Sequence, residues 1–254
     1  MKYAKKLGQN FLIDNNIAKK IVNALYYKKN KKSLNVLEVG AGNGILTKYL
    51  LKSKLLLIEL DTLYVNILRA KFPSLKERII NLDIIKFNPL HFNLTNFILL
   101  GNFPYSVSSQ ILFYLLKYKE FITECVGMFP KKVADRIVNK KKRKKNISVL
   151  TILIKTYFQT KYLFTVSNSV FSPQPKIKSS VIKIKRKKNI SINYIILKKI
   201  VKTAFSQRRK QIKNSLNKIL FDNEFLSNPI FNKRVEQLSI VDFTNISRQV
   251  IKFE

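Results

Sequence analysis

Short apolar runs alternate with longer amphipathic segments along most of the chain, and this alternation limits the possible folds more than any other feature. Each apolar run has the length and the flanking residues of a buried strand. We expect such strands at 35–40, 54–60, 78–84, 96–101 and 124–129. Amphipathic segments such as 109–121 have the apolar spacing of helices. Strands that alternate with helices form a parallel sheet covered by helices, so the sequence predicts a doubly wound α/β fold.

The pattern changes towards the C-terminal end of the chain. Segments 156–166 and 179–186 are rich in β-forming residues and close enough in sequence to pair antiparallel. After residue 188 only helical patterns follow, as in 194–220. We therefore expect two domains, 1–188 and 189–254. The basic run 139–146 lacks apolar periodicity, which predicts a solvated loop or a frayed helix end.

Composition restricts the class of protein further. No apolar run approaches the roughly 18 residues that a membrane span needs, and the apolar part of the N-terminal segment is too short for a signal peptide. Cys125 is the one cysteine, which excludes an internal disulfide and suits the reducing cytoplasm. We expect it to be an inert core thiol. The one histidine, His91, has no partner at metal-ligand spacing, so we expect no metal site.

The charge of the chain is strongly unbalanced. Lys and Arg total 49 against 14 Asp and Glu, a formal net charge of +35. Such a surface attracts polyanions, and nucleic acid is the obvious one. Compositional drift could raise the number of lysines by itself, but it explains the scarcity of acids less well. The charge does not distinguish RNA from DNA.

A glycine turn follows the first predicted strand. Gly40, Gly42 and Gly44 stand in the stretch "VLEVGAGNGILT", between a strand and the start of a helix. Glycine permits a tight turn and lets a ligand approach the main chain. The dinucleotide pattern G-x-G-x-x-G fails, because Ile45 occupies its last position. A tight turn without a ligand would also explain these glycines.

Two acids at later strand ends favour a ligand. Glu59 closes the second predicted strand, where a carboxylate can accept hydrogen bonds from both ribose hydroxyls. Asp83 closes the third and could accept from an adenine amino group. Because the carboxyl ends of the strands in a doubly wound sheet open onto one crevice, the three strand ends together indicate an adenosine-bearing ligand.

The fourth strand ends in the loop "GNFPYSVSSQ" at 101–110. Pro104 restricts Phe103 to extended geometry and so fixes the direction of its carbonyl, while Asn102 supplies an amide oxygen and Tyr105 a flat ring. Two acceptors beside a stacking ring suit an amino group on a heterocycle such as adenine. Acceptors that hold both hydrogens of this amine favour a pyramidal nitrogen, whose lone pair is then available to attack a sulfonium methyl. A Pro-containing strand exit without chemical meaning is the plainer alternative.

With these motifs, the chain resembles the ribosomal RNA adenine dimethyltransferases, in particular the small-subunit group that dimethylates two adjacent adenosines near the RNA 3′ end. The matching segments follow the order of the family at 5–14, 36–47, 58–61, 101–110, 128–137, 171–184 and 205–216. The resemblance implies a Rossmann-like class I methyltransferase fold that uses S-adenosylmethionine, with a small all-helical C-terminal domain. It also implies an enzyme that acts on small-subunit ribosomal RNA or on a precursor of the small subunit. We expect a cytoplasmic protein, and nothing in the sequence demands more than a monomer.

The resemblance assigns roles to individual residues. In this family the target base is flipped out and stacks on the aromatic ring of the target loop, here Tyr105, and Phe171 matches the residue that covers its other face. The catalytic set would thus be Asn102, Phe103, Pro104, Tyr105 and Phe171. Glu59 would hold the ribose of the methyl donor and Asp83 its adenine. The expected cofactor-binding set is Asn10, Leu12, Gly40, Gly42, Glu59, Asp83 and Asn102.

Some positions depart from the family pattern. Phe103 stands where the family usually has Leu or Ile, although the backbone carbonyl is retained. Pro130 and Lys132 replace Gln and Glu, and Lys178 replaces Asp. The segment 142–150 lacks the usual Tyr-Gly. Several of these changes add positive charge.

We expect RNA phosphates to meet a basic stretch of the second domain and the run 139–145. The stretch comprises Arg208, Arg209, Lys210 and Lys213, which we place on one helix with an apolar side of Val201, Phe205, Ile212 and Leu216. An ordinary solvated basic face is the alternative. Two other functions stay open, a large-subunit methyltransferase of the resistance type and a non-catalytic RNA-binding assembly factor on the same fold.

Overall fold

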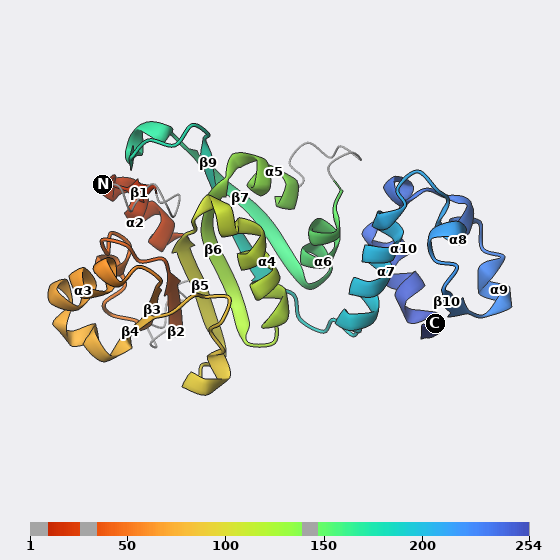
Figure 1. Ribbon diagram of the computed structural model, residues 1–254, viewed down its shortest axis with the longest axis horizontal. Helices are drawn as coiled ribbons and strands as arrows, with labels where there is room; N and C mark the ends of the chain where they lie inside the picture. The colour runs from red at the N-terminus through yellow and green to blue at the C-terminus, as the bar shows by residue number, and fades with distance from the viewer. Residues whose placement is uncertain (1–9, 26–34, 139–146, 254) are drawn as a thin grey trace. The chain divides into compact units, whose positions relative to one another are not determined.

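The centre of the protein is a seven-stranded sheet with the order β4-β3-β2-β5-β6-β9-β7 (Figure 1). The computed structural model describes residues 10–25, 35–138 and 147–253. The strands are β2 (Asn35–Val39), β3 (Lys54–Glu59), β4 (Ile79–Asn81), β5 (Phe97–Asn102), β6 (Ile122–Pro130), β7 (Phe158–Val166) and β9 (Ser179–Arg186). All five strands predicted from apolar runs are confirmed, because each run can be covered on both faces of the sheet.

The order of the strands creates a crevice next to β2. Starting from β2, the chain adds β3 and β4 on one side of the sheet, then crosses over and adds β5 and β6 on the other, all by parallel pairing. The carboxyl ends of β2 and β5 therefore lie side by side at the point where the direction reverses. Ligands of open α/β sheets bind at such points. The last two strands differ, since β9 pairs antiparallel with β6 and β7 is the neighbour of β9.

Two predicted strand boundaries need correction. Asp83 does not close β4, which ends at Asn81. The partner strand β3 ends at Glu59, opposite Asn81, and the pairing stops after the Leu82 N–H donates to the Glu59 carbonyl at 3.1 Å. The Asn81 side chain instead donates to the carbonyls of Glu59 and Leu60 and holds the chain in a turn. The strand predicted to start at 156 starts at Phe158, because the preceding residues form a helix.

Helices cover the sheet in the way that the alternation of side chains requires. They are α2 (Asn15–Asn23), α3 (Thr62–Lys71), α4 (Ser108–Lys117) and α5 (Lys131–Val138). Ile98 and Leu100 of β5 share one buried cluster with Ile21 of α2 and Leu68 of α3. Leu99 lies between them in sequence and points to the other face. Two more helices pack on later strands of the sheet. Helix α4 contacts β6, and α5 contacts both β6 and β9 (Figure 1).

The chain divides into two compact units by its internal contacts. The first comprises Met1–Val138 and Gln159–Arg186, and the second comprises Asn139–Phe158 and Lys187–Glu254. The second unit therefore includes α6 (Val149–Tyr157), whose side chains are buried on most sides. Such a helix needs cover all round, and it packs against two later helices of its unit, α7 and α10. The functional division at residue 188 stays a prediction.

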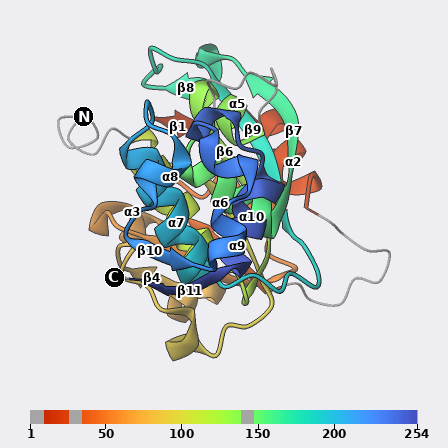
Figure 2. The same cartoon turned by 90° about the vertical axis from the view of Figure 1, so that its right-hand side faces the viewer.

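The second unit contains α7 (Tyr194–Ser206), α8 (Ile212–Ser215), α9 (Asn223–Leu226) and α10 (Ile240–Arg248) (Figure 2). It is mainly helical as predicted, with one addition. Strands β10 (Ile219–Phe221) and β11 (Val250–Phe253) pair antiparallel, so the unit is not all-helical. The two strands are short, and an apolar run of such length does not reveal whether it is a strand or part of a helix.

The helix predicted over 194–220 is interrupted. Helix α7 ends at Ser206, and Gln207 leaves the helical conformation with φ −127° and ψ 55°. The chain then turns, Gln211 bridges to Arg234, and the backbone N–H of Ile212 donates to the Lys233 carbonyl. Ile212 is fully buried, so it still belongs to the core as predicted. Arg208, Arg209 and Lys210, however, lie in the turn between α7 and α8 and not in a helix.

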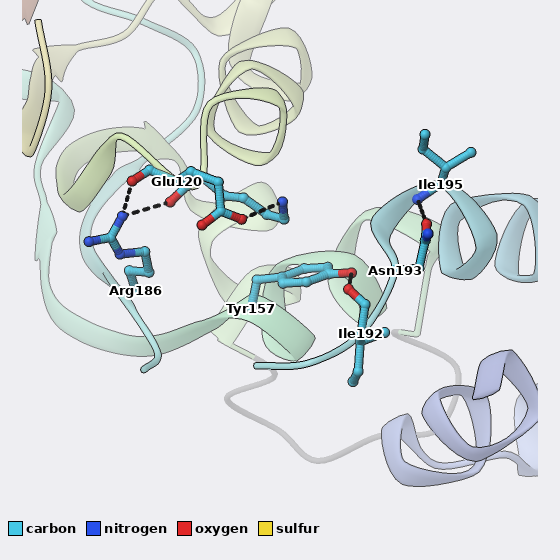
Figure 3. A network of polar contacts seen from close by, with 7 residues as sticks. Glu120, Tyr157, Arg186, Ile192, Asn193 and Ile195 are labelled. Carbon is cyan, nitrogen blue, oxygen red and sulfur yellow. Dashed lines mark hydrogen bonds and ion pairs between the residues drawn. The ribbon is translucent and has the colours of Figure 1, made fainter. Parts of the chain in front are cut away.

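The chain passes from the first unit to the second between Arg186 and Lys187. Single side chains form hydrogen bonds in the segments just before and just after this point (Figure 3). Within the first unit, the Arg186 guanidinium donates to the backbone carbonyls of Lys119 and Glu120. Within the second, the Tyr157 hydroxyl donates to the Ile192 carbonyl at 3.1 Å. Asn193 then begins α7, because its side chain accepts from the N–H of Ile195 at 2.9 Å and caps the helix. These bonds fix where β9 ends and where α7 starts.

The structure also bears on two predictions made from composition, the inert core thiol of Cys125 and the absence of membrane-spanning segments. Cys125 is fully buried in β6, and burial raises the pKa of its thiol, in agreement with an inert core residue. Among the helices of the described residues, none combines the length and the apolar character that crossing a bilayer requires.

A buried carboxyl lies under the crevice. Glu38 of β2 is 1% exposed and accepts a hydrogen bond of 2.9 Å from the Thr47 hydroxyl. Burial raises the pKa of Glu38 from its ordinary 4.5 to about 8, since the charged form loses its hydration. The folded protein therefore keeps a proton at neutral pH that the unfolded chain has released.

This proton makes the stability of the protein depend on pH. Between about pH 5 and pH 8 the folded state binds the extra proton, so the free energy of unfolding should fall as pH rises, by at most about 1.4 kcal/mol per pH unit. Glu38→Gln keeps an acceptor for Thr47 but cannot ionise. We expect urea unfolding at a series of pH values to show the decline in the wild type and to show it weakened in the variant. Parallel pH profiles for the two proteins would contradict the assignment.

Candidate active site

Two adjoining pockets occupy the crevice at the carboxyl ends of β2, β3 and β5. Gly40, Glu59 and Pro104 line both. The first pocket is completed by Asn10, Phe11, Gly42, Asn102, Phe103 and Tyr105. The second is completed by Val39, Ile58, Leu60, Leu82, Asp83, Ile84, Ser106 and Val107. The structure therefore brings the glycine turn, both predicted acids and the target loop of residues 101–110 to one place.

The glycine turn has the backbone that its sequence suggested. Gly40, Gly42 and Gly44 have φ values of +67°, +53° and +78°, which side-chain-bearing residues rarely adopt. A Cβ on Gly44 would also lie 2.5 Å from the Phe72 ring. Since Gly40 and Gly42 line the first pocket, the turn exposes main chain to a ligand and does more than reverse the chain.

Glu59 holds the turn in place. It is 4% exposed, and its two carboxylate oxygens accept from the N–H of Gly42 at 2.9 Å and from the N–H of Asp61 at 3.0 Å. Burial raises the pKa of Glu59, and the backbone donors oppose that rise. A carboxylate oxygen can accept more than one hydrogen bond, so both oxygens remain available to ligand hydroxyls. Glu59 stands where the two pockets meet.

The second pocket combines apolar walls with the carboxylates of Glu59 and Asp83. Leu60, Leu82 and Val107 form apolar wall, and Leu60 is 53% exposed although it is a large hydrophobic residue. One oxygen of Asp83 accepts from the N–H of Ile85 at 2.9 Å. A flat apolar ring with an amino group would satisfy both the walls and the acid. These wall residues were not predicted from the sequence, although an apolar residue directly after a strand-closing acid, as Leu60 is, was a usable signal.

The target loop places its polar groups at the first pocket. The Asn102 side-chain nitrogen donates to the backbone carbonyl of Asn10 at 3.0 Å. This bond fixes the orientation of the amide group, so its oxygen points away from Asn10. The Phe103 ring is buried at 1% exposure, while its residue contributes to the pocket wall. The Tyr105 hydroxyl and the Ser179 hydroxyl of β9 are 2.5 Å apart, which ties the far end of the ring to the sheet.

Leu12 and Phe171 lie elsewhere. They face each other in the antiparallel pair of β1 (Phe11–Leu12) and β8 (Phe171–Ser172). Both are buried, at 1% and 2% exposure, in the core cluster shared with α2 and α3. Neither belongs to the described residues that line the two pockets, so their roles stay predictions. Phe11 lines the first pocket instead, because neighbours in a strand point to opposite sides.

The basic residues of the second unit are exposed. Arg208, Arg209 and Lys210 occupy the turn after α7, and Lys213 lies in α8. They do not share one helix as predicted. Arg208 and Arg209 line a surface hollow together with Arg234, which the sequence analysis missed because it is distant in sequence. The run 139–145 lies outside the described residues.

Comparison with known proteins agrees with this site. A family model described as ribosomal RNA adenine dimethylase matches residues 1–252. A protein of Flavobacterium johnsoniae named ribosomal RNA small subunit methyltransferase A is 42% identical over 98% of this chain and 96% of its own length. A protein of Cytophaga hutchinsonii with the same name is 38% identical, with 98% of each chain covered.

Two solved structures share the fold. A dimethyladenosine transferase from Plasmodium falciparum superposes with a TM-score of 0.78 at 24% identity, over 95% of this chain and all of that one. The 23S rRNA methyltransferase ErmE superposes with a TM-score of 0.72 at 20% identity, over 96% of this chain and all of that one. With a family model that matches nearly every residue and relatives of about 40% identity along their whole length, the chain belongs to the ribosomal RNA adenine dimethylase family.

Proposed function

We propose that this S-adenosylmethionine-dependent enzyme methylates N6 of two adjacent adenosines near the 3′ end of small-subunit ribosomal RNA during ribosome biogenesis. The observation that carries the proposal is the crevice, in which three strand ends and the target loop line two pockets that share Glu59. The relatives of about 40% identity, all named for the small subunit, support the choice of RNA.

The residues of the crevice fit S-adenosylmethionine. Glu59 would accept from the ribose hydroxyls, because its carboxylate lies at the junction of the pockets. Asp83 and the apolar walls of the second pocket suit the adenine. Gly40 and Gly42 leave room beside the main chain for the amino acid part, in the pocket that Asn10 and Asn102 complete. When bound, the cofactor supplies an electrophilic methyl group.

The target loop would orient the accepting adenine. The Asn102 amide oxygen and the Phe103 carbonyl would accept the two hydrogens of the amino group, which favours a pyramidal nitrogen with a free lone pair. Tyr105 would stack on the flipped-out base, with its ring held by Ser179. No strong base is needed, since the nitrogen becomes acidic after transfer. Positioning of this kind can contribute about 7–11 kcal/mol to lowering a barrier.

The proposal also includes the partner of the enzyme and the place where it acts. The substrate would be the small ribosomal subunit or its precursor, and the enzyme would act as a monomer in the cytoplasm, where subunits are assembled. The net charge of +35 and the exposed Arg208, Arg209, Lys210 and Lys213 would meet RNA phosphates.

Two alternatives make different predictions. The fold of ErmE is shared, so architecture alone does not distinguish a large-subunit enzyme from a small-subunit one. A non-catalytic assembly factor would need no intact methyl-transfer loop, yet Asn102 and Tyr105 line the pocket and are anchored by Asn10 and Ser179. The geometry therefore favours an active enzyme.

One experiment separates the three functions. The protein is incubated with labelled S-adenosylmethionine and with unmethylated small subunits, large subunits or no RNA, and the modified base is mapped. We expect transfer to two adjacent adenosines of the small subunit. Transfer to the large subunit would establish the resistance-type function, and transfer to neither would leave the assembly factor.

Asn102→Ala should abolish methyl transfer and leave RNA binding intact. The substitution removes the amide oxygen that would hold the target amine but changes no exposed basic residue. Turnover is measured with small subunits, and RNA affinity by filter binding. Asn66→Ala, an exposed position of α3, serves as the control with normal turnover. Retained turnover in the Asn102 variant would exclude its role.

Glu59→Gln should weaken binding of the demethylated cofactor by about 10- to 100-fold, the effect of leaving a buried polar group badly paired. The amide NH2 must face one of the two backbone N–H groups that the carboxylate now accepts. Isothermal titration calorimetry with S-adenosylhomocysteine measures the change. Glu77→Gln, an exposed acid, is the matched control. Equal affinities in all three proteins would refute the ribose-binding role.

RNA affinity should depend strongly on salt. If about six phosphates are neutralised, affinity falls roughly 10³-fold between about 50 and 200 mM salt. Replacing Arg208, Arg209, Lys210 and Lys213 by Gln should reduce the slope of log affinity against log salt by about three. A variant with the lysines of 139–145 shuffled tests whether that run adds to the slope through its charge alone. An unchanged slope in the fourfold variant would place the phosphates elsewhere.

A further inference from the structure

The buried ring of Phe103 lies over two glycines of neighbouring strands. Gly101 of β5 and Gly127 of β6 are partners in the parallel register. A Cβ built on Gly127 would lie 2.1 Å from Cε2 of Phe103, and one on Gly101 would lie 2.6 Å from Cε1. The ring of Phe129 packs on it with a centroid distance of 5.0 Å. The ring therefore occupies the space that side chains at both glycines would fill.

The two glycines are not equivalent. A Cβ on Gly101 would also lie 2.6 Å from the backbone oxygen of Val39, so this position excludes a side chain whatever residue stands at 103. The atoms nearest to a Cβ on Gly127 all belong to the rings of Phe103 and Phe129. The absence of a side chain at Gly127 therefore leaves room for the Phe103 ring.

The seat of this ring determines where the target loop begins. Phe103 follows the last residue of β5, and Pro104 follows it in extended geometry with ψ 138°. Phe103 as a whole is 1% exposed, and its ring packs over Gly101 and Gly127 and against Phe129. The seat of the ring therefore constrains the backbone of residue 103, its carbonyl included, and the start of the Tyr105 segment.

We propose that Gly127 is a positioning residue for methyl transfer, which acts by seating the Phe103 ring and thereby fixing the carbonyl that would hold the target amine. The inference rests on the proposed role of the target loop. Gly127 is distant from the acids of the proposed cofactor pockets. It lies on β6, whereas Glu59 ends β3 and Asp83 follows β4, and strands β2 and β5 lie between β3 and β6 in the sheet. Disturbing it should therefore affect the chemical step more than cofactor binding.

A double-mutant cycle tests the proposal. Gly127→Ala should lower kcat by about 10²-fold, the effect of a displacement of about 1 Å, while the affinity for S-adenosylhomocysteine stays within about threefold. Phe103→Leu removes the ring atom that lies 2.1 Å from the new Cβ. The double variant Gly127→Ala/Phe103→Leu should recover the kcat of Phe103→Leu alone to within about threefold, so the two effects are strongly non-additive.

Gly101→Ala is the matched control. It meets the same ring but also the Val39 carbonyl, so Phe103→Leu should not rescue it. Additive effects of Gly127→Ala and Phe103→Leu on kcat, or equal rescue of both glycine variants, would overturn the proposal. A lowered Tm in Gly127→Ala with unchanged kcat would do so as well, because it would reveal a purely structural role.

Failure of the proposed function has a separate signature. Wild-type protein that transfers no methyl group to small subunits refutes the function, whatever the variants do. The thermal stability of the four proteins of the cycle needs no substrate and still reports the contact between positions 103 and 127. Coupling in Tm together with coupling in kcat supports the positioning role, whereas coupling in Tm alone in an active enzyme overturns it.

Discussion

The hydrogen bonds of Glu59 to the backbone N–H groups of Gly42 and Asp61 are the interaction on which the site depends. They connect the end of β3 to the turn after β2 and hold Gly42 in a positive-φ conformation that glycine adopts readily and other residues do not. They also place a buried carboxylate where the two pockets meet. Backbone geometry therefore shapes the proposed cofactor pocket, and the acceptors of Glu59 are already in place at its junction.

The few acids of this basic chain are concentrated where the structure requires them. Of 14 acidic residues, Glu38, Glu59 and Glu124 are almost fully buried in the first unit. Glu124 pairs with Lys183 at 3.0 Å, and the same lysine donates to the Ala24 carbonyl at 2.8 Å, which links β6, β9 and the end of α2. Drift towards lysine explains exposed positions well. It does not explain the acids at these three sites. Loss of the carboxyl would remove the acceptor of the Thr47 hydroxyl at Glu38 and of two backbone N–H groups at Glu59, and it would remove the ion-pair partner of Lys183 at Glu124.

The sequence was informative where one local signal determined the structure. Apolar runs located the strands, and strand-closing acids led to Glu59 and Asp83 even though β4 ends before Asp83. Local sequence signals gave the wrong structure where contacts between segments distant in sequence determined the fold. The apolar spacing from Phe205 to Ile212 suits one helix, but the pairing of Gln211 with Arg234 interrupts it. Phe11 was missed because Leu12 carried the family match, although strand alternation places the neighbour at the pocket.

The two halves of the crevice are built by different means. Backbone donors and glycines shape the cofactor half, on the parallel strands β2 and β3. The target half depends on side-chain packing against β6 and β9, the antiparallel pair in which Ser179 lies opposite Pro130. Ser179 holds the Tyr105 hydroxyl, and Gly127 receives the Phe103 ring. Packed side chains can be exchanged for others of similar volume, whereas the positive-φ glycines of the turn cannot. We therefore expect packed side chains of the target half to be freer to change than the glycines of the cofactor half. Phe103 is an example, since it differs from the usual family residue and still lines the first pocket.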